Sequence, residues 1–132
     1  MNNFALSLIL FFFSLNSFAS DLAPEVSLED LKKLVDSKGA VIIDVNSAKS
    51  YESGHIPGAI HFASHEKDLT KVLPSDKTAL IVAYCGGTLC TAWESAAKSA
   101  KALGYTNIKH FKGGISTWKK SELKTEMVTK KS

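Results

Sequence analysis

The sequence predicts an α/β fold, in which helices cover a central and mainly parallel sheet. Helix and strand signals alternate along the chain after residue 26, with no internal repeat and no low-complexity linker. Residues 40–45 form a run rich in β-branched residues, and residues 78–84 form a second, mostly apolar run; both are typical of strands buried on both faces. The second run leads into a glycine-containing turn and a helix, the arrangement that forms a ligand crevice in open parallel sheets.

The length and composition of the chain fit one globular domain. Its 132 residues are 45% hydrophobic and 22% charged, which excludes a disordered or collagen-like protein. The 16 basic residues are all lysines, intermixed with 13 acidic residues to give a net charge of +3. Because no basic stripe is concentrated in the sequence, nucleic-acid binding is not expected. The absence of arginine also excludes any function that needs a guanidinium group from this chain.

Residues 1–19 have the features of a signal peptide. Residues 4–18 are mostly apolar, and Ser17 and Ala19 are the small residues that precede a cleavage site. As a helix this run would span only about 22 Å, less than the ~30 Å of a hydrocarbon core, so a membrane anchor is the weaker alternative. We predict cleavage after Ala19, an exported protein that is periplasmic or secreted, and no stable membrane insertion after cleavage.

Residues 20–119 are predicted to form the folded domain, and the lysine-rich tail at 120–132 is predicted to fray. Ser27 can cap a first helix whose apolar residues recur at three- and four-residue intervals, and Gly39 ends it. A short helix and a turn rich in glycine and proline follow the first strand. The elements predicted in this half are a helix at 27–39, a strand at 40–45, a helix at 47–53, a turn at 54–58 and a strand at 59–62.

The second half of the domain is predicted to continue the alternation of strands and helices. Thr91 and Glu94 have the spacing of a capping box at a helix start, and Gly104 ends that helix. Its buried stripe is expected to contain Trp93, Ala96, Ala97, Ala100 and Leu103. The elements predicted here are a strand at 78–84, a loop at 85–90, a helix at 91–103, a strand at 107–111, a turn at 113–114 and a helix from 115.

The loop after the second buried strand is the predicted reactive site. Cys85 stands at the end of the strand, and Gly86 and Gly87 allow the backbone to curl without a clash at Cβ. The backbone N–H groups of a curled loop and the positive end of the following helix form a site for an anion. The same field favours the reactive thiolate of Cys85, and the alternative is an inert core thiol.

Several short motifs together resemble a single-domain rhodanese. They occur in the order of that family and extend from about residue 26 to residue 119. The matching pieces are Ile43-Asp44-Val45, Tyr51 with the segment 54–61, the strand into Tyr84-Cys85, Leu103-Gly104-Tyr105 with Asn107, and Gly113-Gly114 with Trp118.

The resemblance implies a three-layer α/β/α domain and a sulfurtransferase. Cys85 would take a sulfane sulfur from thiosulfate or a persulfide, hold it as a persulfide, and pass it to cyanide, a small thiol or the thiol of a partner protein. No metal or organic cofactor is expected. The substrate-binding residues would be those of the loop, namely Gly86, Gly87, Thr88, Leu89 and Cys90.

Three positions depart from the family pattern. Asn46 stands where relatives have arginine, Ser50 replaces a glutamate before Tyr51, and Cys90 occupies a position that is often cationic. A cation there would help to bind thiosulfate, so its absence favours a less charged donor such as a small-molecule persulfide. A phosphatase or arsenate reductase is disfavoured, because both need a longer loop and an arginine.

Cys90 has three alternative roles. It can resolve the Cys85 persulfide, form a disulfide with Cys85, or fill apolar space before the helix. The first two leave open a dithiol-redox or non-catalytic binding module that uses the Cys85/Cys90 loop.

The histidines are expected to be structural. His55 fits a hydrogen-bonding role in its turn. His61 and His65 could hold a metal only on a helix, and the residues between them are predicted to be strand and loop. His110 has no assigned face, and Trp93 and Trp118 are predicted to lie in the core.

Overall fold

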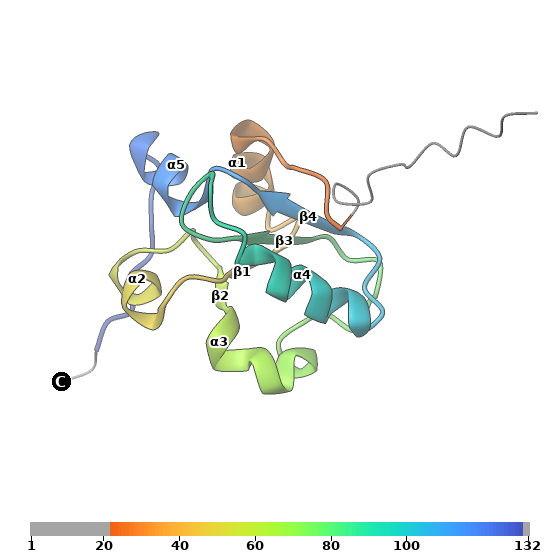
Figure 1. Ribbon diagram of the computed structural model, residues 1–132. Coiled ribbons are helices and arrows are strands. Elements are labelled where there is room, and N and C mark those ends of the chain that lie inside the picture. Colours follow the sequence, from red (N-terminus) through yellow and green to blue (C-terminus); the bar gives the residue numbers. More distant parts are fainter. Residues whose placement is uncertain (1–21, 131–132) are drawn as a thin grey trace, which may run out of the picture.

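The computed structural model describes residues 22–130, and the predicted signal peptide at 1–19 lies outside them. Four parallel strands form one sheet in the order β2-β1-β3-β4 (Figure 1). The strands are β1 (Val41–Asp44), β2 (Ile60–His61), β3 (Ile81–Tyr84) and β4 (Ile108–Phe111). The predicted α/β class with a central parallel sheet is therefore confirmed.

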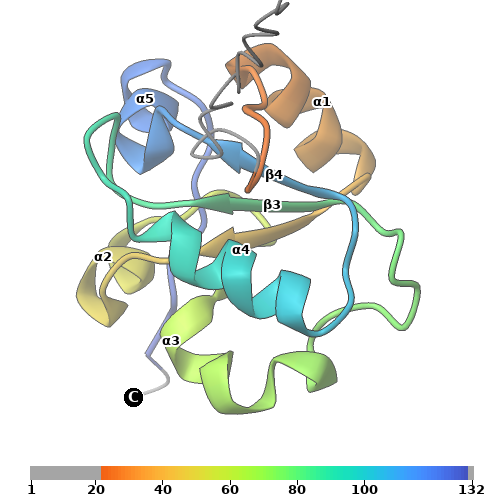
Figure 2. The ribbon, with the colours of Figure 1, turned by 45° about the vertical axis from the view of Figure 1, so that its right-hand side comes forward.

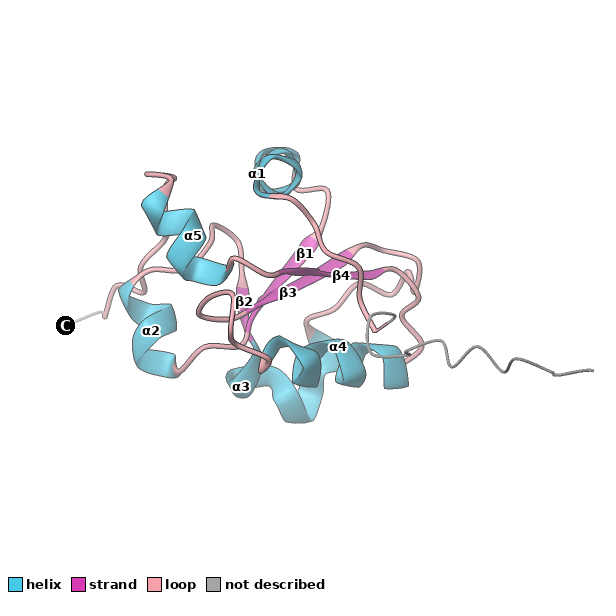
Figure 3. Ribbon diagram, turned by 45° about the horizontal axis from the view of Figure 1, so that its top comes forward, coloured by secondary structure: helices cyan, strands magenta, loops and turns pink. Residues whose placement is uncertain are grey.

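Helices cover both faces of the sheet, as Figure 3 shows. On one face lie α1 (Leu28–Ser37) and α5 (Gly114–Lys120), and on the other lie α3 (Phe62–His65), the 3₁₀ helix η2 (Glu66–Lys71) and α4 (Trp93–Ala102). The short helix α2 (Ala48–Ser53) follows β1. Within the described residues, no helix is both long and apolar enough to span a membrane.

The two central strands are mainly apolar because each of their faces meets a helix layer, and Asp44 at the end of β1 is their one charged residue. Val82 and Tyr84 pack with Leu31 of α1 and Trp118 of α5. The intervening residue Ala83 faces the opposite core. There the small residues of α4 allow its backbone to approach the sheet closely: Ala96, Ala97 and Ala100 are fully buried.

The first helix forms as predicted. The Ser27 hydroxyl accepts a hydrogen bond from the Asp30 amide at 3.1 Å, which caps the helix start. At the other end, Lys38 has a left-handed φ of 54°, and the Gly39 amide donates to the Leu34 carbonyl at 2.9 Å.

The prediction of strand and loop around Phe62 is wrong. β2 pairs with β1 only through Ile60 and His61, because β1 ends at Asp44 and offers no further backbone partner. The chain therefore turns into α3 at Phe62, whose side chain is buried in the core below the sheet.

The predicted capping box at the start of α4 is also wrong. The helix begins at Trp93, and Ala92 at its N-cap has no side chain that could cap it. The Glu94 amide donates to the Thr91 carbonyl at 3.0 Å, whereas the Glu94 carboxylate lies 3.5 Å from the Lys98 ammonium group. Leu103, predicted to be buried, lies beyond the helix and is 37% exposed.

The tail makes hydrogen bonds as far as Val128, so the expected fraying is wrong for residues 121–128. The Trp118 indole donates to the Lys124 carbonyl at 2.9 Å. His55 and Glu126 exchange two backbone hydrogen bonds of 2.9 Å, and the Val128 amide donates to the Glu52 carbonyl at 3.1 Å. Sequence alone missed this contact, because the tail has no strand periodicity and finds its partners in a distant turn. Figure 1 shows the tail passing beside α2.

Candidate active site

The loop at residues 85–90 leaves the carboxyl end of β3, between its neighbours β1 and β4. Cys85 is only 2% exposed, whereas the loop tip is open and Leu89 is 96% exposed. Figure 2 shows that the loop lies between α5 and the start of α4. The predicted site residues are thus brought into one turn, and whether they bind substrate stays a prediction.

The start of α5 holds the beginning of this loop. The Ile115 amide donates to the Cys85 carbonyl at 2.9 Å, and the Ser116 amide donates to the Gly86 carbonyl at 3.0 Å. Gly114 lies directly below with a left-handed φ of 60°, and a Cβ there would collide with the Cys85 carbonyl and lie 2.8 Å from the Gly87 nitrogen. The close approach of loop and helix therefore requires a glycine at 114.

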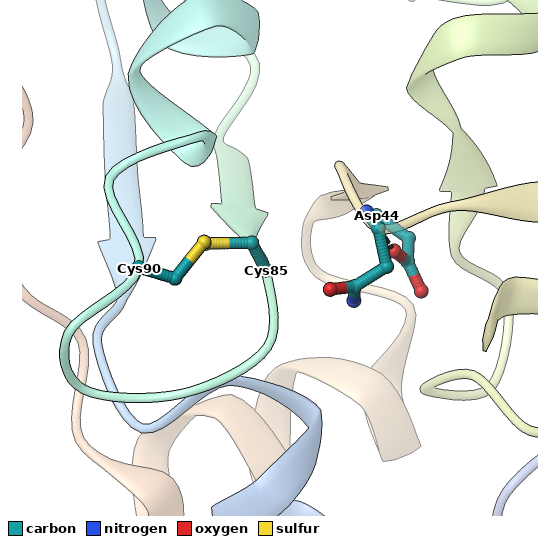
Figure 4. The surroundings of a disulfide bond; sticks show 4 residues. Asp44, Cys85 and Cys90 are labelled. Atoms are coloured by element: carbon teal, nitrogen blue, oxygen red, sulfur yellow. Dashed lines mark hydrogen bonds between the residues drawn. A yellow bond between two sulfur atoms is a disulfide. The ribbon is translucent and has the colours of Figure 1, made fainter.

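A disulfide joins Cys85 and Cys90 across the loop (Figure 4). Their Cα atoms are 6.3 Å apart, within the range that a disulfide needs. This bond is one of the three roles of Cys90 that the sequence left open. The spacing of the two cysteines permits a disulfide, but whether it forms depends on how tightly the loop curls. In this state neither sulfur is a thiolate, so Cys85 can act as a nucleophile only after reduction.

Four backbone N–H groups of the loop are free to bind a ligand. The Cys90 amide donates to the Gly87 carbonyl at 3.1 Å and closes the turn. The amides of Gly86, Gly87, Thr88 and Leu89, here called the open amides, have no acceptor among residues 22–130. Such a set of unpaired donors in one turn favours a negatively charged group beside Cys85.

A buried polar network supports the loop from the side of β1. Asp44 is 1% exposed, and its carboxylate accepts hydrogen bonds from the Tyr84 hydroxyl at 2.6 Å and from the Asn46 amide at 2.7 Å. The Tyr84 oxygen in turn accepts from the Ile56 amide at 3.1 Å. Burial raises the pKa of Tyr84 far above its ordinary value of 10.0, and the Asp44 charge adds to this effect. Tyr84 therefore keeps its proton, and the network fixes the ends of β1 and β3.

Asn46 places an amide beside the loop. Its side-chain oxygen lies 3.6 Å from where a Cβ on Gly86 would stand. Its Nδ2 is buried and has no hydrogen-bond acceptor in the described part of the chain. The Asn46 carbonyl accepts from His61 Nε2 at 2.8 Å, which fixes the backbone here. The sequence identified Asn46 only as a departure from the family pattern. In the structure it lies beside the loop and has a hydrogen-bond donor without an acceptor in the described residues.

A pocket of about 510 Å³ opens on the other side of the loop, at Cys90. The Trp93 indole forms one wall and stacks on the His110 ring, with centroids 3.9 Å apart and planes within 4°. We call this hollow the Cys90 pocket; its lining includes Thr88, Cys90, Thr91, Trp93, His110 and Lys112.

Sequence reasoning missed the role of His110 and placed Trp93 in the core. The His110 Nδ1 bonds to the Ala23 carbonyl at 2.6 Å, so the chain before α1 fixes the ring. The available signal was the position of His110 on β4, the neighbour of the strand that leads into Cys85. Trp93 is half-buried, because one side of its ring faces the pocket.

Two of the remaining histidines, His55 and His61, have structural hydrogen bonds. His55 Nδ1 donates to the Tyr51 carbonyl at 2.7 Å, and its ring stacks on Tyr51. His61 uses both ring nitrogens, because Nε2 donates to Asn46 and Nδ1 accepts from the Ser64 hydroxyl at 2.8 Å. Among the described residues, no group of three potential ligands comes close enough to hold a metal ion.

Comparison with known proteins decides the family. The family model for the Rhodanese-like domain matches residues 27–121. The chain belongs to this family. Among the relatives of this rhodanese-like protein is the thiosulfate sulfurtransferase GlpE of Pseudomonas entomophila, 31% identical over 84 residues that make up 63% of this chain and 73% of the relative. The GlpE of Pseudomonas putida is 30% identical over 99 residues, or 74% and 83% of the two chains.

Solved structures agree with this assignment. The BH2092 protein of Bacillus halodurans superposes with a TM-score of 0.69 and 31% identity, over 80% of this chain and 78% of the other. The human single-domain sulfurtransferase TSTD1 superposes with a TM-score of 0.61 and 26% identity, over 74% and 96%. The protein is accordingly a sulfurtransferase of the rhodanese type, and the predicted family and enzyme class are confirmed.

Proposed function

We propose that this rhodanese-like protein transfers a sulfane sulfur from a donor to a thiol through a persulfide on Cys85. The observation that carries this proposal is the position of Cys85 at the base of a turn with four open amides. A persulfide anion on Cys85 would project its terminal sulfur into that turn. The open amides would stabilise the charge as an oxyanion hole does.

The reaction needs only the reduced loop and the two substrates. The Cys85 thiolate attacks the outer sulfur of a donor persulfide, the donor's sulfur–sulfur bond breaks, and the donor leaves as a thiolate. An acceptor thiolate then attacks the outer sulfur of the Cys85 persulfide, which regenerates the Cys85 thiolate. Each step exchanges one sulfur–sulfur bond for another, so no external oxidant or reductant is consumed.

A persulfide is the donor that the charges of the site favour over thiosulfate. The chain has no arginine. Lys112 is the cation that lines the Cys90 pocket, and its ammonium group lies 3.8 Å from the Glu25 carboxylate, which offsets its charge. A thiosulfate dianion would meet chiefly amides here, whereas the reacting group of a persulfide carries a single charge and needs less compensation. We therefore propose faster sulfur uptake from glutathione persulfide than from thiosulfate.

The test follows sulfur uptake by intact mass on protein that has been reduced and freed of reductant. Cys90→Ser isolates Cys85, and it should gain one sulfur atom from glutathione persulfide and lose it again to cyanide. Cys85→Ser with Cys90→Ser is the matched control and should gain none. Equal uptake by both would contradict the assignment of Cys85. If neither gains sulfur from any donor, a dithiol-redox or binding module, which the disulfide favours, becomes the better proposal.

We also propose that the protein acts outside the cytoplasm, after cleavage behind Ala19. The predicted signal peptide motivates this location, and a disulfide between neighbouring cysteines is the form expected in an oxidising compartment. Cell fractionation together with N-terminal sequencing tests it. A mature protein that begins at Ser20 in the exported fraction is the expected result, and a cytoplasmic protein that keeps residues 1–19 would contradict it.

A further inference from the structure

We propose that Cys90 resolves the Cys85 persulfide, so that the protein releases the carried sulfur as hydrogen sulfide and is left with the Cys85–Cys90 disulfide. This inference rests on the proposed function, because it needs a persulfide on Cys85. It adds a second outcome for the same intermediate. The sulfur is either handed to an acceptor or reduced to sulfide by the protein's own second thiol.

The disulfide establishes that the two sulfurs reach each other within this fold. The Cα atoms of Cys85 and Cys90 are 6.3 Å apart, and the turn between them is closed by the hydrogen bond from the Cys90 amide to the Gly87 carbonyl. α5 holds the beginning of the turn through Ile115 and Ser116. A thiol on Cys90 is therefore held close to Cys85, and such proximity gives an intramolecular attack a large advantage over attack by a dissolved thiol.

The resolving step balances without any added oxidant. The Cys90 thiolate attacks the inner sulfur, Sγ of Cys85, and forms the Cys85–Cys90 bond. In this step the outer sulfur carries a proton, which the persulfide anion has taken up from water. The persulfide bond breaks, and its electron pair leaves with the outer sulfur as hydrosulfide, which takes up a second proton to the extent that pH allows. The outer sulfur is reduced, the two cysteine sulfurs are oxidised to the disulfide, and the donor's sulfane sulfur is the oxidant.

A new turnover needs a dithiol reductant, and the structure indicates which sulfur it attacks. Cys85 is only 2% exposed, whereas Cys90 is half-buried and lines the Cys90 pocket. An incoming thiolate therefore reaches Cys90 and forms a mixed disulfide there. The Cys85 thiolate is the leaving group, and the open amides stabilise its charge. The second thiol of the reductant then frees Cys90.

The surface around Cys90 suits a dithiol carried by a protein. Leu89 precedes Cys90 in the loop and is 96% exposed, so it offers an apolar contact to a protein that approaches Cys90. The stacked Trp93 and His110 rings give the pocket a flat wall against which the extended segment around a reactive cysteine can lie. We therefore expect a protein dithiol to reduce this disulfide faster than a small dithiol of similar potential.

The principal experiment is a single turnover without reductant. Fully reduced wild-type protein receives one equivalent of glutathione persulfide, and released sulfide, free thiols and intact mass are followed together. We expect one sulfide and the loss of both thiols per protein molecule. Cys90→Ser and Cys90→Ala should instead retain the extra sulfur on Cys85 and release no sulfide above the background of the double cysteine variant. Ser95→Ala, on the exposed face of α4, should behave as the wild type does.

The outcomes separate this inference from the proposed function. If the wild type keeps a stable persulfide beside a free Cys90 thiol, the inference fails and the proposed function stands. Sulfide release by Cys90→Ser at the wild-type rate also overturns it. If Cys90→Ser takes up no sulfur, the proposed function fails and the inference fails with it.

The direction of reduction has its own readout. Oxidised wild-type protein is treated briefly with glutathione, quenched with acid, and the mixed disulfide is located by peptide fragmentation. We expect glutathione on Cys90 and a free thiol on Cys85. Glutathione on Cys85 would overturn the assigned direction.

Discussion

The carboxyl ends of β1 and β3 lie side by side, with Asp44 opposite Tyr84, yet their polar groups are in opposite states. At the end of β1 the Asp44 carboxylate is buried and accepts two hydrogen bonds. At the end of β3 the loop carries the open amides and a disulfide. The hydrogen-bonded carboxylate at the end of β1 holds the sheet in place, whereas the open amides after β3 remain free to bind a ligand. The difference separates the scaffold of this site from its chemistry.

Gly114→Ala should have the largest effect, because it displaces the loop at the end of β3. The new Cβ would collide with the backbone at Cys85 and Gly87, at a φ that alanine disfavours. We expect a loss of about 3 kcal/mol in the free energy of unfolding and at least about a tenfold loss in the rate of sulfur uptake. Urea unfolding and single-turnover mass spectrometry measure these two effects.

Gly58→Ala is the matched control for this prediction. Gly58 also has a positive φ, 79°, but nothing lies within 4 Å of the place where an alanine methyl group would stand. Its cost should therefore be the backbone strain alone, about 1 kcal/mol, with sulfur uptake unchanged. Equal losses of uptake in the two variants would show that the contact between α5 and the loop does not position Cys85.

Asp44→Asn should affect stability far more than chemistry. The substitution removes a buried charge that accepts from both Tyr84 and Asn46, and one of these donors loses its strong acceptor. We expect a loss of about 2 kcal/mol in the free energy of unfolding. Sulfur uptake, measured where the variant is fully folded, should stay close to that of the wild type. A collapse of uptake in a folded variant would mean that the two ends are not separable.

Tyr84 should make the protein less stable at high pH. The folded protein keeps the Tyr84 proton, because its pKa lies far above the ordinary value of 10.0 that applies in the unfolded chain. Unfolding therefore releases this proton above that pH, and stability should fall by about 1.4 kcal/mol for each further pH unit. Tyr84→Phe lacks this titration. Urea unfolding of both proteins between about pH 8 and pH 11 should give curves that converge, and parallel curves would refute the pKa shift.

Asn46→Ala should have the smallest effect on stability and the most specific effect on chemistry. Its Nδ2 has no acceptor within the described residues, so removing it relieves an unsatisfied buried donor. We expect stability to stay the same or rise by up to about 1 kcal/mol. We expect sulfur uptake to fall severalfold, because the Asn46 side chain lies beside Gly86 and its Nδ2 is free to assist the loop. Unchanged uptake would assign the binding of the sulfur to the open amides alone.

The sequence predicted those parts of the molecule whose signals are local. The runs that became β1 and β3 are mainly apolar because both faces are covered, and Ser27 caps α1 through a contact only three residues away. The reactive loop was also found, because Gly86 and Gly87 follow Cys85 at the end of a buried strand. Each of these features depends on residues that lie close together in the sequence, so the sequence alone could predict it.

The features that escaped prediction depend on contacts between distant segments. α3 begins at Phe62 because the pairing of β2 with β1 ends at Asp44 and His61. β1 lies well before Phe62 in the sequence, so no local pattern contains this limit. The stack of Trp93 on His110 joins α4 to β4, and neither local pattern contains it. The disulfide depends on how tightly the loop curls, which the spacing of Cys85 and Cys90 leaves open.

The contacts of the tail and of the segment before α1 have a practical consequence for protein engineering. The family match covers residues 27–121, but Ala23 binds the His110 ring and Glu126 bonds with His55 outside those limits. A fragment trimmed to the family boundaries would lose a wall of the Cys90 pocket and uncover the turn at His55. The contacts that hold this domain together therefore extend beyond its family match, and fusion partners belong before Leu22 or after Val128.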